Sequence, residues 1–392
     1  MENQNQVNQK RINAGNIAFV SGLLILTLGC WNEYSWYEVM APLGTLISFV
    51  CLSVTLLCYE DIRTLVRDKI FILMIVADVV TLAHLFIVGS GKGAFLTVCD
   101  LLLVLYLTDK IVFGRKLRLF LMLYQAFYFF YWTVDVKGYF KGYNTNYGGL
   151  VLITGFVFAV MAVFCLRDEL ERREKRKLSY ASYVLLIALI AVGYNIIAWY
   201  RARCALLGFI VYLVLIMCPK KMWNNKVLYA LLRWALTFGA IIISLVYVFL
   251  GRSEFTIEIF YKNIISGREE IWAELWSAYL HSPFLGIGSS YKMQIPWMDG
   301  MFEVHNGLLD ILFVHGLSVF IVVMVMLLKL LKRLGPCAAN SMPQKCALSG
   351  MYAILAASFM ENFFIVPPFL LCFMLLGILA MRQEGTKSLV GS

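Results

Sequence analysis

The chain has 392 residues, of which 61% are hydrophobic and only 15% are charged. Soluble domains keep roughly a quarter of their residues charged, so this composition excludes an ordinary soluble protein and indicates one that lies in a lipid bilayer. The net charge of +10 would suit nucleic acid, but the basic residues lie between apolar stretches, as in the loops of membrane proteins, and we expect no nucleic-acid partner.

Apolar stretches follow one another along the chain, and most are long enough to cross the bilayer core as a helix of about 17–25 residues. We therefore predict an all-α integral membrane protein with about 12 transmembrane helices, residues 1–392 forming a single polytopic membrane domain. The predicted spans are residues 16–31, 39–58, 70–89, 94–112, 117–133, 148–166, 179–199, 203–218, 227–250, 307–328, 346–364 and 366–381.

Lysine and arginine are concentrated in every second connection between these stretches, for example in residues 167–177 and 219–226. Cytoplasmic loops of membrane proteins carry such an excess of basic residues. The pattern predicts that both the N-terminus and the C-terminus are cytoplasmic. We interpret residues 167–177 as a solvated linker rather than as a site for anionic lipid or a partner.

Residues 251–306 form a long connection between the ninth and tenth predicted spans, on the outer side of the membrane in this topology. Loops of this length are usually functional or disordered, and this one has too many large apolar side chains for disorder. We expect one large folded extracytoplasmic loop (periplasmic in a host with two membranes). Within it, a helix is predicted from about Arg268, with Trp272, Trp276 and Tyr279 on one face.

Three groups of residues are candidates for chemistry. Arg268 begins the predicted helix, and helix N-terminal amides together with a guanidinium suit an anion such as diphosphate. His305 directly precedes the tenth span, and an imidazole titrates near working pH, as a general base must. Arg201 and Arg203 lie in a short outer turn, against the positive-inside trend. A structural interpretation stays open for each group: arginines on lipid headgroups, and an interfacial histidine without a role.

The sequence contains no Walker A motif, no G-x-G-x-x-G, no H-E-x-x-H and no D-x-D triplet. These patterns hold phosphates, dinucleotides and metals. We expect no cofactor and no metal site. If the chain transfers a sugar, cationic side chains must hold the leaving group.

Three short segments follow one another in the second half of the chain: Ser-Gly-Arg-Glu-Glu-Ile-Trp at 266–272, Ser-Pro-Phe-Leu-Gly-Ile-Gly at 282–288 and His-Asn-Gly at 305–307. Together they resemble the O-antigen ligase and polymerase family of bacteria. Asn146 and Arg203 are similar to two upstream signatures of that family, although Ala202 stands where the family usually has Ser. The resemblance spans residues 140–330.

The resemblance implies a metal-independent glycosyltransferase of cell-surface polysaccharide biosynthesis, such as capsule or O-antigen, in the bacterial plasma (inner) membrane. Its donor is a glycan on undecaprenyl diphosphate, and an acceptor sugar hydroxyl attacks the anomeric carbon at the outer face. Other polysaccharide-assembly membrane proteins are possible partners. By the same resemblance His305 is the catalytic base, and Arg203 and Arg268 bind the diphosphate, with Arg201 a weaker candidate. The supporting residues are Glu303, Asn306, Asn146 and Trp272, of which Glu303 is also an alternative base.

Three alternatives remain. A polymerase, which joins repeat units, is favoured over a ligase, which moves finished glycan to a lipid or protein, because nothing marks a dedicated acceptor site. A transporter or flippase for lipid-linked glycan would usually show internal repeats and broken or charged helices in the membrane, and the sequence indicates neither. A non-catalytic scaffold would leave the outward arginines unexplained.

Overall fold

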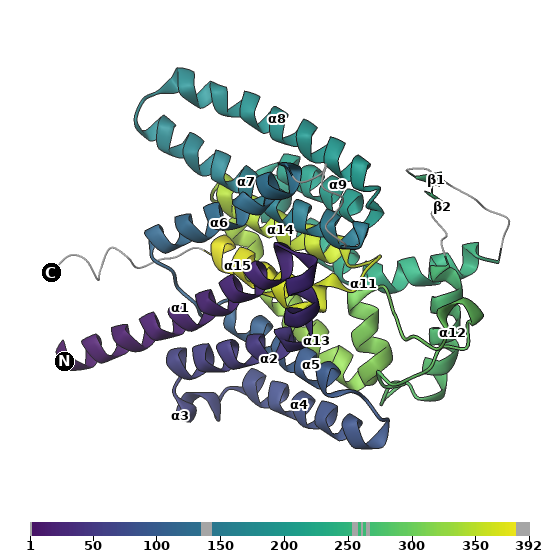
Figure 1. Ribbon diagram of the computed structural model, residues 1–392. Helices are drawn as coiled ribbons and strands as arrows, with labels where there is room; N and C mark the ends of the chain where they lie inside the picture. The colour runs from purple at the N-terminus through teal and green to yellow at the C-terminus, as the bar shows by residue number, and fades with distance from the viewer. Residues whose placement is uncertain (1, 135–142, 253–257, 260–261, 264–266, 382–392) are drawn as a thin grey trace. The chain divides into compact units, whose positions relative to one another are not determined.

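The computed structural model describes residues 2–134, 143–252, 258–259, 262–263 and 267–381 (Figure 1). They divide into two compact units, each built from several separate stretches of the chain. The first unit comprises residues 1–110, 234–330 and 358–371, and the second comprises residues 111–233, 331–357 and 372–392.

The first unit begins with five helices and continues, after a long excursion of the chain, with the elements that carry the candidate site. The opening helices are α1 (Glu2–Trp31), α2 (Tyr34–Tyr59), α3 (Ile62–Leu65), α4 (Lys69–Ile87) and α5 (Lys92–Leu107). The later elements are most of α11 (Lys226–Leu250), β1 (Glu258–Ile259), β2 (Lys262–Asn263), α12 (Arg268–His281), η2 (Pro296–Met298), most of α13 (Gly307–Ala338), η3 (Phe363–Ile365) and the start of α15 (Pro367–Ala380).

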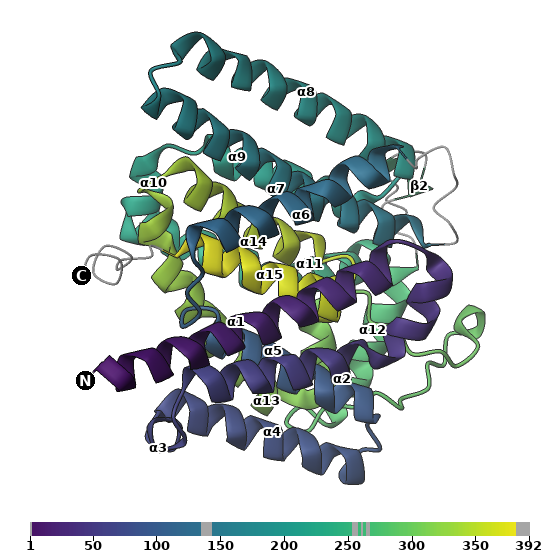
Figure 2. The ribbon, with the colours of Figure 1, turned by 60° about the vertical axis from the view of Figure 1, so that its left-hand side comes forward.

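Helices α1 and α2 lie side by side along most of their length (Figures 1 and 2). Three glycines at intervals of seven residues face the contact: a Cβ on Gly15 would lie 2.9 Å from Cβ of Cys58, one on Gly22 2.9 Å from Cβ of Cys51, and one on Gly29 2.7 Å from Cγ of Met40. Small residues let membrane helices approach closely, because packing rather than the hydrophobic effect holds such helices together.

The second unit has α7 (Thr145–Arg172) at its centre, in contact with four other helices of the unit. Figures 1 and 2 show α6 to α9 as neighbours. Most of α7 is buried, as is all of α14 except its first residues, which identifies these two as the core of this unit. The other helices are α6 (Arg115–Val134), α8 (Arg176–Tyr200), α9 (Arg203–Met217), α10 (Lys220–Asn224) and α14 (Met342–Ala357).

The predicted all-α architecture is confirmed, and each of the predicted spans overlaps a helix, although the spans 94–112 and 346–364 run past the ends of α5 and α14. Among the described residues, seven helices are long and apolar enough to cross a membrane: Gln6–Trp31, α2, α4, α7, Lys177–Tyr200, α11 and α13. The chain is therefore a multi-pass membrane protein. The other five predicted spans are shorter or carry basic residues at one end, and they stay predictions as membrane crossings. The orientation also stays a prediction, and residues 382–392, predicted to be cytoplasmic, lie outside the described part.

The long connection 251–306 is described only in part, because residues 253–257, 260–261 and 264–266 lie outside the described residues. One large folded loop is therefore not shown as a whole. From Gly267 onward the chain is ordered around α12: the Trp297 indole donates to Glu270 Oε2 (2.8 Å), and the Gln294 amide donates to Glu274 Oε1 (2.7 Å).

Helix α13 is broken at Gly316, whose φ of 75° and ψ of 177° are not helical. Two carbonyls just before the break accept from the motif at 282–288: Phe313 from the Ile287 amide (2.7 Å) and Val314 from the Gly288 amide (3.2 Å). On the other side of the break, the Leu317 amide donates to the Pro283 carbonyl (2.8 Å). Non-helical backbone within a membrane helix must find such partners in protein.

No broken helix was expected from the sequence, and that expectation is wrong at Gly316. Two histidines in predicted spans are also paired, since the rings of His84 and His315 stack with their centroids 6.1 Å apart. Here the break is covered by the protein's own loop, so it fixes the position of residues 283–288 beside α12.

Replacing Gly316 with alanine is expected to destabilise the protein by about 3 kcal/mol or more, because this backbone region is nearly confined to glycine and a Cβ would collide with the Phe284 carbonyl. Gly300→Ala is the matched control: φ there is also positive (74°), but a Cβ has nothing within 4 Å. Thermal unfolding in detergent should show a large loss for the first variant and a small one for the second. Equal losses would contradict the role of the packed break.

Candidate active site

Helix α12 supplies one wall of the candidate site. Gly267 precedes it in the left-handed conformation (φ 86°), and the helix begins at Arg268, as predicted. One face is buried and includes Arg268, Trp272 and Tyr279. Trp276, predicted on the same face, is half-buried and donates its indole N–H to Ser244 Oγ (3.2 Å). The predicted face is therefore confirmed, with Arg268 at its first turn.

Four charged side chains of the first unit form a continuous chain of alternating sign. Arg268 Nη2 lies 2.6 Å from Glu361 Oε1, and Glu361 Oε2 lies 3.1 Å from His305 Nδ1. The other ring nitrogen, His305 Nε2, lies 2.8 Å from Glu303 Oε2. The side chains of Arg268 and Glu361 are 10% and 8% exposed, whereas His305 is 27% and Glu303 is 56% exposed. The chain thus runs from a buried ion pair to a solvent-accessible carboxylate.

The His-Asn-Gly motif holds His305 in place through its neighbours. Val304 accepts the Trp272 indole N–H (2.8 Å), which ties the segment to α12. Asn306 caps α13, its Oδ1 accepting from the amides of the second and third helical residues, and its Nδ2 donates to the Phe359 carbonyl (3.0 Å). His305 itself has a left-handed φ of 52°, which is uncommon for a residue with a side chain. The imidazole is therefore fixed from both sides.

The carboxylates keep the His305 ring protonated. Burial by itself would lower the pKa of His305, but hydrogen bonds to Glu303 and Glu361 and the negative charge of Glu361 outweigh it and raise the pKa to about 9. The hydrogen bond from His305 lowers the pKa of the Glu303 carboxyl by more than burial raises it. At neutral pH both ring nitrogens therefore donate, and His305 is a cation in this arrangement.

Glu361 is the residue that the sequence analysis missed. It falls inside the predicted span 346–364, which assigned it no role. In the structure α14 ends at Ala357, and Glu361 lies in the turn before η3. There one carboxylate oxygen contacts Arg268 and the other contacts His305. One signal was available, a carboxylate at the end of an apolar stretch just before Pro367 and Pro368. The sequence does not show, however, that this carboxylate contacts Arg268 and His305, which are 93 and 56 residues away along the chain.

The remaining predicted site residues lie in the second unit. Asn146 is in the first turn of α7, and its carbonyl accepts from the Cys204 thiol at 3.9 Å. Arg203 is the first residue of α9 and half-buried, and Arg201 lies exposed at the left-handed end of α8 (φ 51°). The structure thus brings Asn146 close to the start of α9, where an arginine and helix amides suit an anion.

The described ranges contain no group of three His, Cys, Asp or Glu side chains placed to hold a metal ion. The site has cationic and carboxylate groups instead, in the arrangement given above.

Residues 196–324 match the model of the O-antigen ligase family, Wzy_C. The predicted resemblance is confirmed over this segment. No curated protein and no solved structure shows significant similarity to the chain. The O-antigen ligase segment begins later than the predicted region 140–330. It includes Arg201, Arg203, Arg268 and His305, whereas Asn146 and Glu361 lie outside it.

Two residues of the first unit, Arg268 and His305, lie within the O-antigen ligase segment and have side chains suited to chemistry. Arg268 carries a permanent charge, and its planar guanidinium can bind phosphate oxygens in pairs. His305 has a carboxylate on each ring nitrogen, so it can accept or release a proton on the exposed side only when Glu303 moves or takes up that proton. Ser266, at the start of the arginine motif, lies outside the described residues.

Proposed function

We propose that the chain is a glycosyltransferase of bacterial cell-surface polysaccharide biosynthesis that polymerises repeat units carried on undecaprenyl diphosphate. The observation that supports it is the buried Arg268 and the adjacent His305, joined through Glu361, in a membrane protein with an O-antigen ligase segment. Lipid-linked glycans are the substrates that this family implies. A buried guanidinium beside an imidazole is the pair of groups that such a reaction needs.

The reaction forms one bond and breaks one. An acceptor sugar hydroxyl attacks the anomeric carbon, the bond from that carbon to the diphosphate oxygen breaks, and undecaprenyl diphosphate leaves with the electron pair. The hydroxyl proton passes to a base. Attack opposite the leaving group inverts the anomeric centre, so a product with retained configuration would exclude this path. Arg268 stabilises the charge that develops on the diphosphate, and we propose the same role for Arg203 and, as a weaker candidate, for Arg201.

In the proposed mechanism His305 is the base and Glu361 orients it. Glu361 holds Nδ1, as an acidic residue does in many histidine-based catalytic sites. Nε2 then points to the position of the acceptor hydroxyl, which the Glu303 carboxylate occupies at 2.8 Å in this structure. The acceptor displaces Glu303, and the Nε2 proton passes to solvent water, so that the ring is neutral when it takes the proton of the hydroxyl. We further propose that this happens at the outer face of the plasma membrane, with other polysaccharide-assembly proteins as partners.

The test uses purified protein in liposomes, an undecaprenyl-diphosphate oligosaccharide as the only substrate, and a metal chelator. Glycan products are resolved by size. A ladder of products is expected for a polymerase, because each product is again an acceptor. Transfer only to an added lipid or protein acceptor would replace the polymerase proposal by the ligase alternative.

The absence of transfer with several lipid-linked donors and acceptors would contradict the proposal as a whole. Movement of the intact donor across the liposome membrane is measured in the same preparation. Movement without transfer would favour the transporter alternative.

A further inference from the structure

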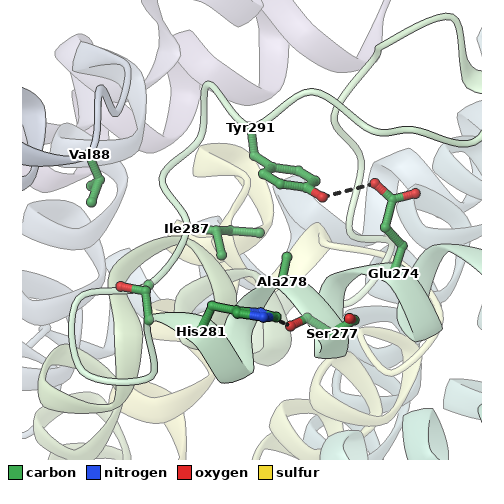
Figure 3. A pocket seen from close by; sticks show the side chains of 9 residues that line it. Val88, Glu274, Ser277, Ala278, His281, Ile287 and Tyr291 are labelled. Atoms are coloured by element: carbon green, nitrogen blue, oxygen red, sulfur yellow. Dashed lines mark hydrogen bonds between the residues drawn. The ribbon is translucent and has the colours of Figure 1, made fainter.

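A second concave site lies on the same helix as Arg268 and is not part of the charged chain. It is a pocket of about 590 Å³ between the second half of α12 and residues 282–291. Figure 3 shows Tyr291 and Ile287 on one side and Glu274, Ser277 and His281 on the helix below. Its volume lies within the range of small-molecule sites, about 300–1,000 Å³.

The pocket face of α12 is distinct from its buried face. Glu274, Ser277, Ala278 and His281 follow one another at intervals of three, one and three residues, so they share one side of the helix. The buried face of the same helix carries Arg268 and packs into the protein. The same helix therefore contributes one face to the candidate active site and another face to the pocket.

The opposite wall is fixed as well. The Ile287 amide donates to the Phe313 carbonyl at the break in α13 (2.7 Å), and the Gly286 amide donates to the Ser282 carbonyl (2.8 Å). The Tyr291 hydroxyl donates to Glu274 Oε1 (3.0 Å), which closes one end of the pocket. Both walls are therefore held in place by hydrogen bonds. The break at Gly316 contributes to this, because the Phe313 carbonyl beside it accepts from the Ile287 amide.

The polar groups in the pocket can both donate and accept. His281 Nδ1 lies 2.8 Å from the Ser277 carbonyl. Since a carbonyl oxygen only accepts, Nδ1 carries a proton and donates in this contact. The Ser277 hydroxyl donates and accepts, the Glu274 carboxylate accepts, and the Tyr291 ring offers a flat apolar surface.

These groups fit a sugar and oppose a diphosphate. A sugar ring presents hydroxyls that donate and accept, together with apolar C–H faces. Among the residues that line the pocket, Glu274 is the one with a fixed charge, and none is Lys or Arg. The Glu274 carboxylate repels a diphosphate, so we expect the lipid diphosphate and the pocket's ligand to be different parts of the substrate.

We propose that this pocket is a subsite for the glycan, holding a sugar residue away from the reacting bond; the proposal rests on glycan transfer as the proposed function. Ser277 is nine residues after Arg268, so the two are about 14 Å apart along the helix axis. The pocket residues lie on a different face of α12 from Arg268, so a glycan with its diphosphate end at Arg268 would pass around the helix as well as along it to reach the pocket. The pocket favours long glycans over short ones.

The test fills the pocket with a larger apolar side chain. In Ser277→Leu, the ratio of kcat/KM for a donor with a full repeat unit to that for a donor with one sugar is expected to fall about tenfold, a loss of one hydrogen-bonded contact. Ala273→Leu, an exposed position of α12 outside the pocket, is the matched control and should keep the ratio. Leucine favours helix at both positions, so folding is preserved.

A second measurement separates this proposal from the proposed function. Oligosaccharides released from the host's own surface polysaccharide, free of lipid and phosphate, are titrated against the purified protein. Weak binding that is lost in Ser277→Leu and kept in Ala273→Leu supports the subsite even if no transfer is detected. Equal behaviour of wild type, Ser277→Leu and Ala273→Leu in both binding and donor preference would overturn it.

Discussion

Replacing Arg268 with methionine is expected to reduce glycan transfer by about 10²–10³-fold, the cost of removing one preorganised group that stabilises developing negative charge. The same change leaves the carboxylate of Glu361, 8% exposed, without its 2.6 Å partner. Breaking one side of a buried ion pair costs about 3–5 kcal/mol. Stability and activity should therefore both fall, as measured by thermal unfolding in detergent and by the transfer assay.

A second substitution separates the two effects. In the double variant Arg268→Met with Glu361→Met, both buried charges are gone, and apolar replacement of a buried pair is often close to neutral for stability. Most of the lost stability should return while transfer stays lost. Arg252→Met, an exposed arginine of the same connection, is the control for a change of charge alone. Recovered transfer in the double variant would show that Arg268 serves the fold and not the reaction.

The helices of this protein were predictable because they depend on composition over short stretches. An apolar run of sufficient length indicates a membrane helix whatever it packs against, and the spacing of Trp272, Trp276 and Tyr279 similarly located α12. The glycines at positions 15, 22 and 29 were an unused signal of the close contact between α1 and α2.

The features that were missed depend on contacts between distant segments. At the break, the carbonyls of residues 313 and 314 accept from the amides of residues 287 and 288. The local sequence of α13 does not predict these contacts. Glu361 pairs with Arg268 across 93 residues of sequence. The charge of His305 follows from two carboxylates at 2.8 and 3.1 Å. Sequence motifs therefore located the arginine and the histidine, but not the residue that joins them.

The pH dependence of transfer should distinguish the two roles open to His305. A base must be neutral, so kcat/KM should rise with pH through the His305 pKa of about 9 and level off above it. A cation that binds phosphate must be protonated, so the rate would instead fall above pH 9. His305→Ala should lower the rate by about 10²–10⁴-fold and remove this pH dependence.

Glu303→Gln sharpens the same test. The hydrogen bond to Glu303 is one of the contacts that raise the pKa of His305, so its loss should lower that pKa. If His305 is the base, the rising limb moves to lower pH, and transfer at pH 7 increases, because more of the imidazole is neutral there. If Glu303 is the base, this variant loses transfer at every pH. Glu38→Gln, an exposed carboxylate on α2, should leave the pH profile unchanged, which confines the expected shift to the carboxylate that contacts Nε2.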